Sequence, residues 1–167
     1  MNSNKNNKDH IQRYRPGVGI TLFNREGCVF LGERLDHPGS WQMPQGGIDD
    51  GEDPATAALR EMEEETGTGN ARILGIMEDW LYYDVPEHTA QRLWDGKYCG
   101  QKQKWVALEF LGDDAEINLA AHEHPEFGQW KWVPLQDLCS YAVPFKRETY
   151  ARVIKEFARY VKDGAVP

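Results

Sequence analysis

The chain has 167 residues, of which 40% are hydrophobic and 28% charged, and its formal net charge is -8 at pH 7. This length and composition predict one globular domain, and they exclude a disordered chain or a second independent core. The acidic charge argues against broad, salt-driven binding along a nucleic-acid backbone, so no DNA partner is expected, although one phosphorylated end could still be recognised.

The cysteines indicate a reducing compartment. Cys28, Cys99 and Cys139 lie far apart and form no CxxC pair, so neither a disulfide framework nor a zinc site is predicted. The sequence begins with polar residues and contains no run of about 18 apolar residues. We therefore expect a cytoplasmic protein with no membrane partner.

The N-terminal part is predicted to consist of a tail followed by strands. Residues 1–12 are polar and are expected to form a flexible tail. Two segments rich in β-formers follow at 18–24 and 28–34, and the Arg-Glu-Gly sequence between them predicts a hairpin. Residues 41–44 are expected to form a short strand.

A helix is predicted between Asp53 and Gly67. A carboxylate at the N-cap followed by proline favours a helix start, and glycine favours a helix end. Apolar residues at helical spacing predict a second, amphipathic helix from Pro144 to about Lys162. Further strands are expected at 71–85, as one long strand or a strand pair, at 104–111 and at 129–134.

This order of elements, in which strands outnumber helices, predicts an α+β fold with a mixed sheet covered by helices. No internal repeat or low-complexity linker divides the sequence. We expect a single domain over residues 13–162, followed by a short C-terminal tail at 163–167.

The first helix carries four glutamates within the five positions 61–65. At about 100° per residue, Glu61, Glu64 and Glu65 share an arc of about 100°, whereas Glu63 lies on another side of the helix. Like charges at this spacing repel one another, and the C-terminal end of a helix dipole disfavours anions. This charge therefore needs a compensating partner.

Two kinds of partner could compensate for the glutamates. Arg60 can pair with Glu64 on the same helix or with Glu52 across the preceding loop. Hard divalent cations, above all Mg²⁺ or Mn²⁺, would neutralise the rest and would link the carboxylates to substrate phosphates. The alternative interpretation is a solvated charged face without a ligand.

Seven residues between positions 46 and 68 occur at the spacing GX5EX7REUXEEXGU, in which U is apolar: Gly46, Glu52, Arg60, Glu61, Glu64, Glu65 and Gly67. This spacing resembles the Nudix box, although Thr68 stands where the pattern has an apolar residue. The resemblance implies the Nudix fold, in which a mixed β-sheet is sandwiched between α-helices. It also implies hydrolysis of a nucleoside diphosphate linked to another group.

The same resemblance implies roles for single residues. Arg60 and Glu52 would form an orienting ion pair. Bound cations would lower the pKa of a water and position it for attack at phosphorus. The proton of that water would pass to Glu64, Glu65 or Glu126, among which the base is left open. The residues expected to hold the metal are Glu61, Glu64, Glu65, Glu126 and the main chain at Gly46.

Segments outside the box resemble the bacterial RNA 5′-pyrophosphohydrolase branch, which also contains asymmetrical diadenosine tetraphosphate hydrolases. These segments are YRPGVGITLFN (14–24), WQMPQGGI (41–48), GQKQKW (100–105), PEFGQWKWV (125–133) and VPFKRETY (143–150). The resemblance covers about residues 13–160. It implies that pyrophosphate or phosphate is removed from a 5′-triphosphorylated or 5′-diphosphorylated RNA end, which initiates mRNA decay.

The branch also implies substrate contacts. Arg15 would bind phosphate, while Arg34 and Phe145 would sandwich a base. Lys102 and Lys104 alternate along one strand face and are further candidates for phosphate binding, although lysines on an exposed sheet are ordinary.

Two alternative functions accompany this interpretation. The first is hydrolysis of dinucleoside polyphosphates, which would use the same residues. The second is a nucleotide-binding regulator that has lost catalysis, and the complete set of box glutamates argues against it.

Overall fold

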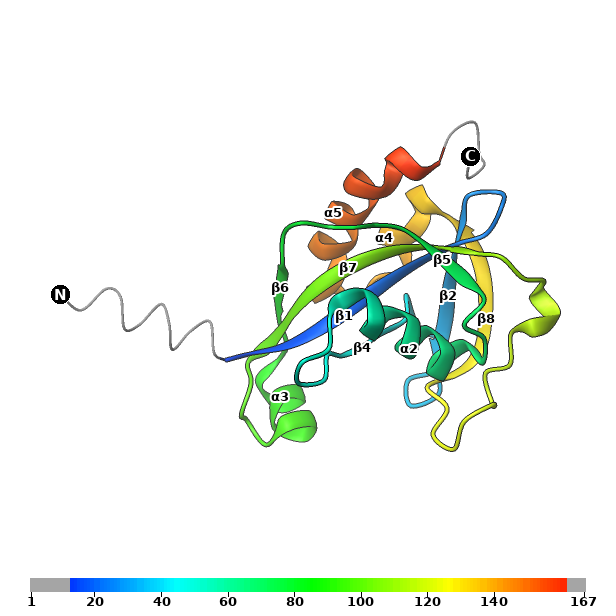
Figure 1. The fold of residues 1–167 in the computed structure, drawn as a ribbon. Coiled ribbons are helices and arrows are strands. Elements are labelled where there is room, and N and C mark those ends of the chain that lie inside the picture. The colour runs from blue at the N-terminus through cyan, green and yellow to red at the C-terminus, as the bar shows by residue number, and fades with distance from the viewer. Residues whose placement is uncertain (1–12, 162–167) are drawn as a thin grey trace.

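The computed structural model describes residues 13–161, so the tails predicted at 1–12 and 163–167 lie outside the described residues. Within this part of the chain, the strands form one eight-stranded mixed sheet with helices on both faces (Figure 1). The strands are β1 (Tyr14–Phe23), β2 (Cys28–Arg34), β3 (Trp41–Gln42), β4 (Gln45–Gly47), β5 (Ala71–Ile76), β6 (Leu81–Asp84), β7 (Gly100–Phe110) and β8 (Phe127–Pro134). The helices are α2 (Pro54–Thr66), α3 (Glu87–Trp94), α4 (Leu138–Tyr141) and α5 (Arg147–Phe157). The predicted α+β architecture is confirmed.

The predicted hairpin closes at its turn and then opens. β1 and β2 pair only at Phe23 and Val29. Beyond that point β1 pairs in parallel with β7 along its whole length and antiparallel with the short β4, whereas β2 pairs with β8. The two strands therefore diverge, and β3 and β4 lie at the wide end of the opening.

Separate apolar clusters anchor α2 and α5. Ala58 and Met62 of α2 belong to the cluster that includes Ile20, Phe30 and Leu108. Tyr150, Val153 and Phe157 of α5 join the cluster that includes Trp105 of β7 and Leu138 of α4. Figure 1 shows α2 on one side of the sheet and α4 and α5 on the other. Because each helix is fixed by its own cluster, the sheet is sandwiched.

The ends of α2 are as predicted. The side chain of Asp53 accepts a hydrogen bond from the backbone N–H of Thr56 at 2.8 Å, and Pro54 begins the helix. Gly67 adopts a φ of 79° and donates its backbone N–H to the carbonyl of Glu63. A left-handed residue here favours glycine, because a Cβ would add steric cost.

Several predicted elements differ in extent: the strands expected at 18–24, 104–111 and 129–134 begin earlier, and the strand expected at 41–44 covers only residues 41–42. The segment 71–85 is a strand pair, β5 and β6, which both pair with β7. The C-terminal helix is shorter than predicted, since α5 covers residues 147–157 and is flanked by 3-10 turns at 144–146 and 158–160.

The helix α3 was not predicted. It has eight residues, begins after Pro86, ends at Asp95 in a left-handed conformation and buries only Ala90. Ala90, Leu93 and Trp94 lie at helical spacing, but a pattern this short does not identify a helix in the sequence. In residues 13–161, no helix combines the length and apolar character needed to cross a membrane. The cytoplasmic location stays a prediction.

Candidate active site

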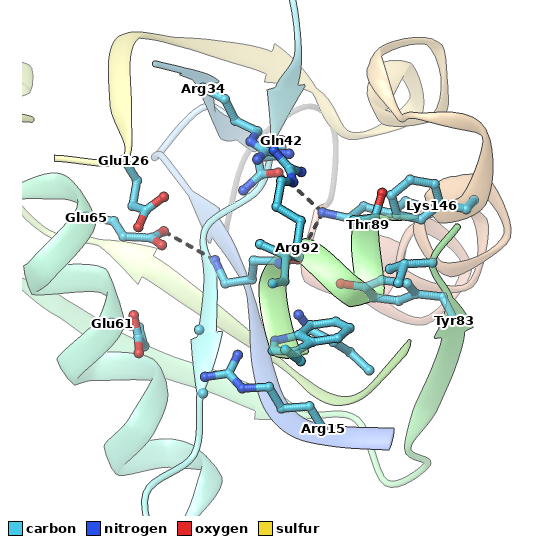
Figure 2. Close-up of a pocket in the computed structure, with 18 of the residues that line it drawn as sticks. Arg15, Arg34, Gln42, Glu61, Glu65, Tyr83, Thr89, Arg92, Glu126 and Lys146 are labelled. Carbon is cyan, nitrogen blue, oxygen red and sulfur yellow. Dashed lines mark hydrogen bonds between the residues drawn. The ribbon is translucent and has the colours of Figure 1, made fainter. Parts of the chain in front are cut away.

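A cavity of about 420 Å³ lies where α2, β4, α3 and the start of the 3-10 turn before α5 approach one another. Figure 2 shows Glu61, Glu65 and Glu126 along one side of this cavity, while basic side chains occupy the other. Glu64 also lines it. The basic residues in the lining are Arg15, Arg34, Arg92 and Lys146.

The helical spacing correctly predicted which glutamates of α2 share one face. Glu61, Glu64 and Glu65 all line the cavity, whereas Glu63 is exposed and does not. The three differ in burial: Glu65 is only 6% exposed, and the side chains of Glu61 and Glu64 are 12% and 49% exposed.

Burial and neighbouring charges alter the titration of these carboxyls. Burial raises the pKa of Glu65 well above its usual value, and the charges of Glu61 and Glu126 add to this effect. The backbone N–H of Gln45 donates a hydrogen bond to Glu65 Oε2 at 3.2 Å and opposes it in part. The pKa of Glu61 is also raised, mainly by burial. A buried, charged pair of this kind favours a cation nearby.

The predicted pair of Arg60 and Glu52 is present. Arg60 Nε and Nη2 donate to the two carboxylate oxygens of Glu52 at 2.9 and 2.8 Å. Nη2 also donates to the carbonyl of Gly47 at 2.9 Å, and Nη1 donates to Glu61 at 2.9 Å and to Glu64 at 3.4 Å. Arg60 therefore ties the loop before α2 to two glutamates of the cavity.

The two glycines of β4 permit close approaches. A Cβ at Gly46 would overlap with the carboxylate of Glu61. A Cβ at Gly47 would lie 2.6 Å from Nη2 of Arg15. Glycine at both positions thus lets the carboxylate of Glu61 from α2 and the guanidinium of Arg15 from β1 approach the same stretch of backbone.

The donor set fits a divalent cation that is shared with a substrate. Within residues 13–161, no three carboxylate, imidazole or thiol groups converge closely enough to hold a metal ion alone. Four carboxylates nevertheless line one cavity. Mg²⁺ keeps several waters and is commonly bound by one or two carboxylates together with substrate phosphates, so a complete protein cage is not required.

The side chains predicted to sandwich a base line the same cavity. Arg34 is held by a two-point ion pair to Asp36, at 2.9 and 2.6 Å. Phe145 is 37% exposed and packs against Tyr83, with 5.8 Å between ring centroids and 32° between the ring planes. Arg34 lies in β2 and Phe145 lies in the 3-10 turn before α5, so the fold brings two distant segments of the sequence to one cavity.

Sequence reasoning missed Lys146. Its ammonium group is buried and donates to Oε1 of Gln42 and of Gln45, each at 3.2 Å. Gln45 Oε1 also accepts from Gln103 Nε2 at 3.1 Å. Burial, with the charge of Arg34, lowers the pKa of Lys146 to about 8. The lysine inside VPFKRETY and the glutamine before Gly46 were the available signals.

Lys102 and Lys104 do not contribute to this cavity. Both ammonium groups lie over the ring of Trp80, at 5.0 and 5.4 Å from its centroid, and Lys104 also donates to the carbonyl of Glu78. Strand alternation explains the difference, because Gln101, the neighbour of Lys102, lines the cavity instead. The structure places both lysines outside the cavity, so their role in phosphate binding stays a prediction that this cavity does not support.

A mixed sheet between helices, with a glycine-led loop and a glutamate-rich helix beside a basic pocket, defines the Nudix fold and site. The chain matches the NUDIX domain model over residues 13–157, and it belongs to this family. Nudix hydrolases generally use divalent metal ions.

Curated relatives extend this result. The chain is 57% identical over 147 residues to the RNA pyrophosphohydrolase of Rhodospirillum rubrum, and the match covers 88% of each protein. It is 49% identical to the RNA pyrophosphohydrolase of a Wolbachia species from Brugia malayi, over 90% of this chain and 93% of the relative.

Solved structures confirm the fold at low identity. The dihydroneopterin triphosphate pyrophosphohydrolase of E. coli superposes with a TM-score of 0.65 at 17% identity, over 86% of this chain and 98% of that one. A C. elegans Ap4A hydrolase superposes with a TM-score of 0.58 at 22% identity, with the same coverage.

Proposed function

We propose that this protein is an RNA pyrophosphohydrolase that converts a 5′-triphosphorylated or 5′-diphosphorylated RNA end to a 5′ monophosphate. The observation that carries the proposal is that one cavity holds the α2 glutamates together with Arg34 and Phe145. Curated relatives with 57% and 49% identity bear the name of this activity, which supports RNA as the substrate. Residues 13–162 would act as one catalytic domain, in the cytoplasm.

The reaction is a hydrolysis of a phosphoric anhydride. A water oxygen forms a bond to phosphorus while a bridging P–O bond breaks, and pyrophosphate or phosphate leaves. Glu61, Glu64, Glu65, Glu126 and the Gly46 main chain would hold divalent cations, with Mg²⁺ the first choice and Mn²⁺ the second. When bound, such cations neutralise phosphate charge and lower the pKa of a coordinated water.

The protein side chains would position the metal-binding glutamates, bind the phosphates and accept the proton. Arg60 holds two glutamates and the loop before α2 in place through its contacts with Glu52 and Glu61. Arg15 would bind the phosphates beside Gly47, because its guanidinium already lies against that backbone. Glu64, Glu65 and Glu126, which all line the cavity, are the carboxylates that we propose as candidates for the base.

Base recognition would come from stacking. Arg34 offers a guanidinium plane fixed by Asp36, and Phe145 offers an exposed ring. Stacking on such faces tolerates different bases, so the enzyme would accept many RNA 5′ ends.

The second candidate is hydrolysis of dinucleoside polyphosphates. The same acidic and basic groups in one cavity favour it, because such a substrate also carries a base and a phosphate chain. The specificity constants for a 5′-triphosphorylated RNA and for diadenosine tetraphosphate, measured under Mg²⁺, would rank the two. A large preference for the dinucleotide would overturn the proposal.

Catalysis itself is tested with two glutamine variants on α2. Glu64→Gln removes a carboxylate of the cavity and should lower the release of pyrophosphate by at least a hundredfold, whereas Glu63→Gln, on another side of the same helix, should not. If wild-type protein binds triphosphorylated RNA but releases no product, the chain is a binding regulator and the enzyme proposal fails.

A further inference from the structure

The wall that α3 contributes to the cavity has no assigned role. Thr89, Arg92, Leu93 and Trp94 line the cavity from this helix. Only Ala90 of α3 is buried, and Leu93 is 51% exposed. Thus most of the helix surface is not buried in the core, and the side chains that face the cavity are accessible to a substrate.

The basic groups of the cavity differ in how far they are already engaged. The guanidinium of Arg34 is held by Asp36. The ammonium of Lys146 is buried and bonded to two glutamine side chains. Each of these two groups has therefore already committed two of its donors to protein partners.

Arg15 and Arg92 are the remaining cations of this lining. Arg15 comes from β1 and lies against Gly47, near the acidic side. Arg92 comes from α3, is exposed, and among residues 13–161 has neither a hydrogen bond nor an ion pair. Figure 2 includes both side chains in the same pocket.

We propose that Arg92 is a further phosphate-binding residue, whose guanidinium holds the 5′ phosphate chain from α3 while Arg15 holds it from β1. The proposal rests on the proposed function. A guanidinium presents a planar fork of donors that suits phosphate oxygens, and charge-assisted bonds of this kind are the strong ones. In a chain of net charge -8, two guanidinium groups that make no hydrogen bond or ion pair among residues 13–161 concentrate the attraction for anions in one cavity.

The arrangement predicts discrimination by phosphate number. A 5′ triphosphate or diphosphate offers the oxygens needed to contact both arginines, whereas the 5′ monophosphate product has a single phosphate group. Arg92 should therefore strengthen the binding of substrate more than that of product, and this difference would favour product release.

Binding without divalent cations tests this role directly. A chelator is added, and the affinities for one short RNA are measured with a 5′ triphosphate and with a 5′ monophosphate. Arg92→Gln should weaken triphosphate binding about tenfold and monophosphate binding much less, because one charged contact is lost. Arg92→Lys should recover part of the loss, since it keeps the charge but not the fork.

Arg25→Gln is the matched control. Arg25 is exposed, lies in the turn between β1 and β2, and does not line the cavity. This variant has the same charge change and should bind both RNAs as the wild type does. The thermal midpoint of Arg92→Gln should equal that of the wild type, because the side chain has no hydrogen-bond or ion-pair partner to lose among residues 13–161.

Two results would overturn the proposal: equal triphosphate affinity in the wild type and Arg92→Gln, or an equal loss in Arg92→Gln and Arg25→Gln. Failure of the proposed function has a different signature. In that case the wild type, supplied with Mg²⁺, would release no pyrophosphate from the triphosphorylated RNA, whatever the state of Arg92.

Discussion

At the scale of single residues, carboxylates of the same type have opposite environments. Glu52 accepts two hydrogen bonds from Arg60, and these contacts lower its pKa to about 2. Glu65 is buried near Glu61 and Glu126, so its pKa is raised. The first carboxylate is stabilised by the protein alone, whereas the second is placed where a cation or a proton would stabilise it.

Glu52→Gln should change the pH dependence of stability. The folded pKa of about 2 lies below the ordinary value of 4.5, so ionised Glu52 stabilises the fold above pH 4.5, and this contribution is lost as the pH falls from 4.5 to 2. Thermal midpoints measured across this range should show a wild-type advantage that shrinks with acidification. Glu63→Gln, whose exposed side chain makes no ion pair in the described chain, should show no such trend.

Glu65→Gln should raise the stability of the metal-free protein at pH 8. The amide can still accept the hydrogen bond from Gln45, but it removes a buried charge. Because the folded pKa is raised, the gain should decrease as the pH falls toward 4.5. A gain of 1 kcal/mol corresponds to a shift of about 2–4 °C in thermal midpoint for a chain of this size.

Magnesium provides the complementary measurement. Millimolar Mg²⁺ should raise the thermal midpoint of the wild type through binding to the folded state, and it should raise that of Glu65→Gln less. An unchanged wild-type midpoint would count against a metal site on α2.

At the scale of elements, α2 determines where the acidic side of the cavity lies. Its N-terminus is fixed by Asp53, its apolar side by Ala58 and Met62, and its acidic side faces the cavity. The short helix α3 contributes the opposite wall with almost no core of its own. One wall is thus built by strong packing and the other by a lightly anchored segment.

Asp53→Ala should weaken α2 at its start. The variant loses the hydrogen bond to the N–H of Thr56 and should lower the free energy of unfolding by about 0.5–2 kcal/mol, measured by urea denaturation. Asp50→Ala is the control, because Asp50 is an exposed loop carboxylate just before the helix. Equal losses in both variants would show that the cap is not the cause.

At the scale of the whole molecule, a buried contact joins α5 to the chain between β3 and β4. The backbone N–H of Met43 donates to the hydroxyl of Tyr150 at 2.9 Å, and the ring of Tyr150 packs edge-on against Trp105. This contact fixes the backbone immediately before Gln45 and Gly46. The position of the cavity therefore depends on a helical residue that lies 107 positions later in the sequence.

Tyr150→Phe should leave the N–H of Met43 buried without its partner. The expected loss is about 1–3 kcal/mol in the free energy of unfolding, measured by chemical denaturation. Tyr82→Phe removes a hydroxyl from a side chain that is 48% exposed and should be nearly neutral. A neutral Tyr150→Phe would mean that water or a shifted backbone replaces the hydroxyl.

Local signals were enough for much of the fold. Asp53, Pro54 and Gly67 bounded α2 because capping and left-handed backbone depend on residue type and immediate neighbours. Helical spacing also separated Glu63 from the three glutamates of the cavity. The strand pair at 71–85 was left undecided, and α3 was missed because its apolar pattern spans only eight residues.

The sequence by itself determined the acidic arc on α2, which follows from helix geometry, whereas it left Arg60 open between Glu64 and Glu52 until the Nudix resemblance implied the pair with Glu52. Only the tertiary structure decided which basic side chains line the same cavity as these glutamates. Arg15, Arg34, Arg92 and Lys146 come from four separate segments, and strand alternation turned Lys102 and Lys104 away from the cavity. The physical reason is that the position of a side chain in a cavity depends on the packing of distant elements, which no local spacing specifies.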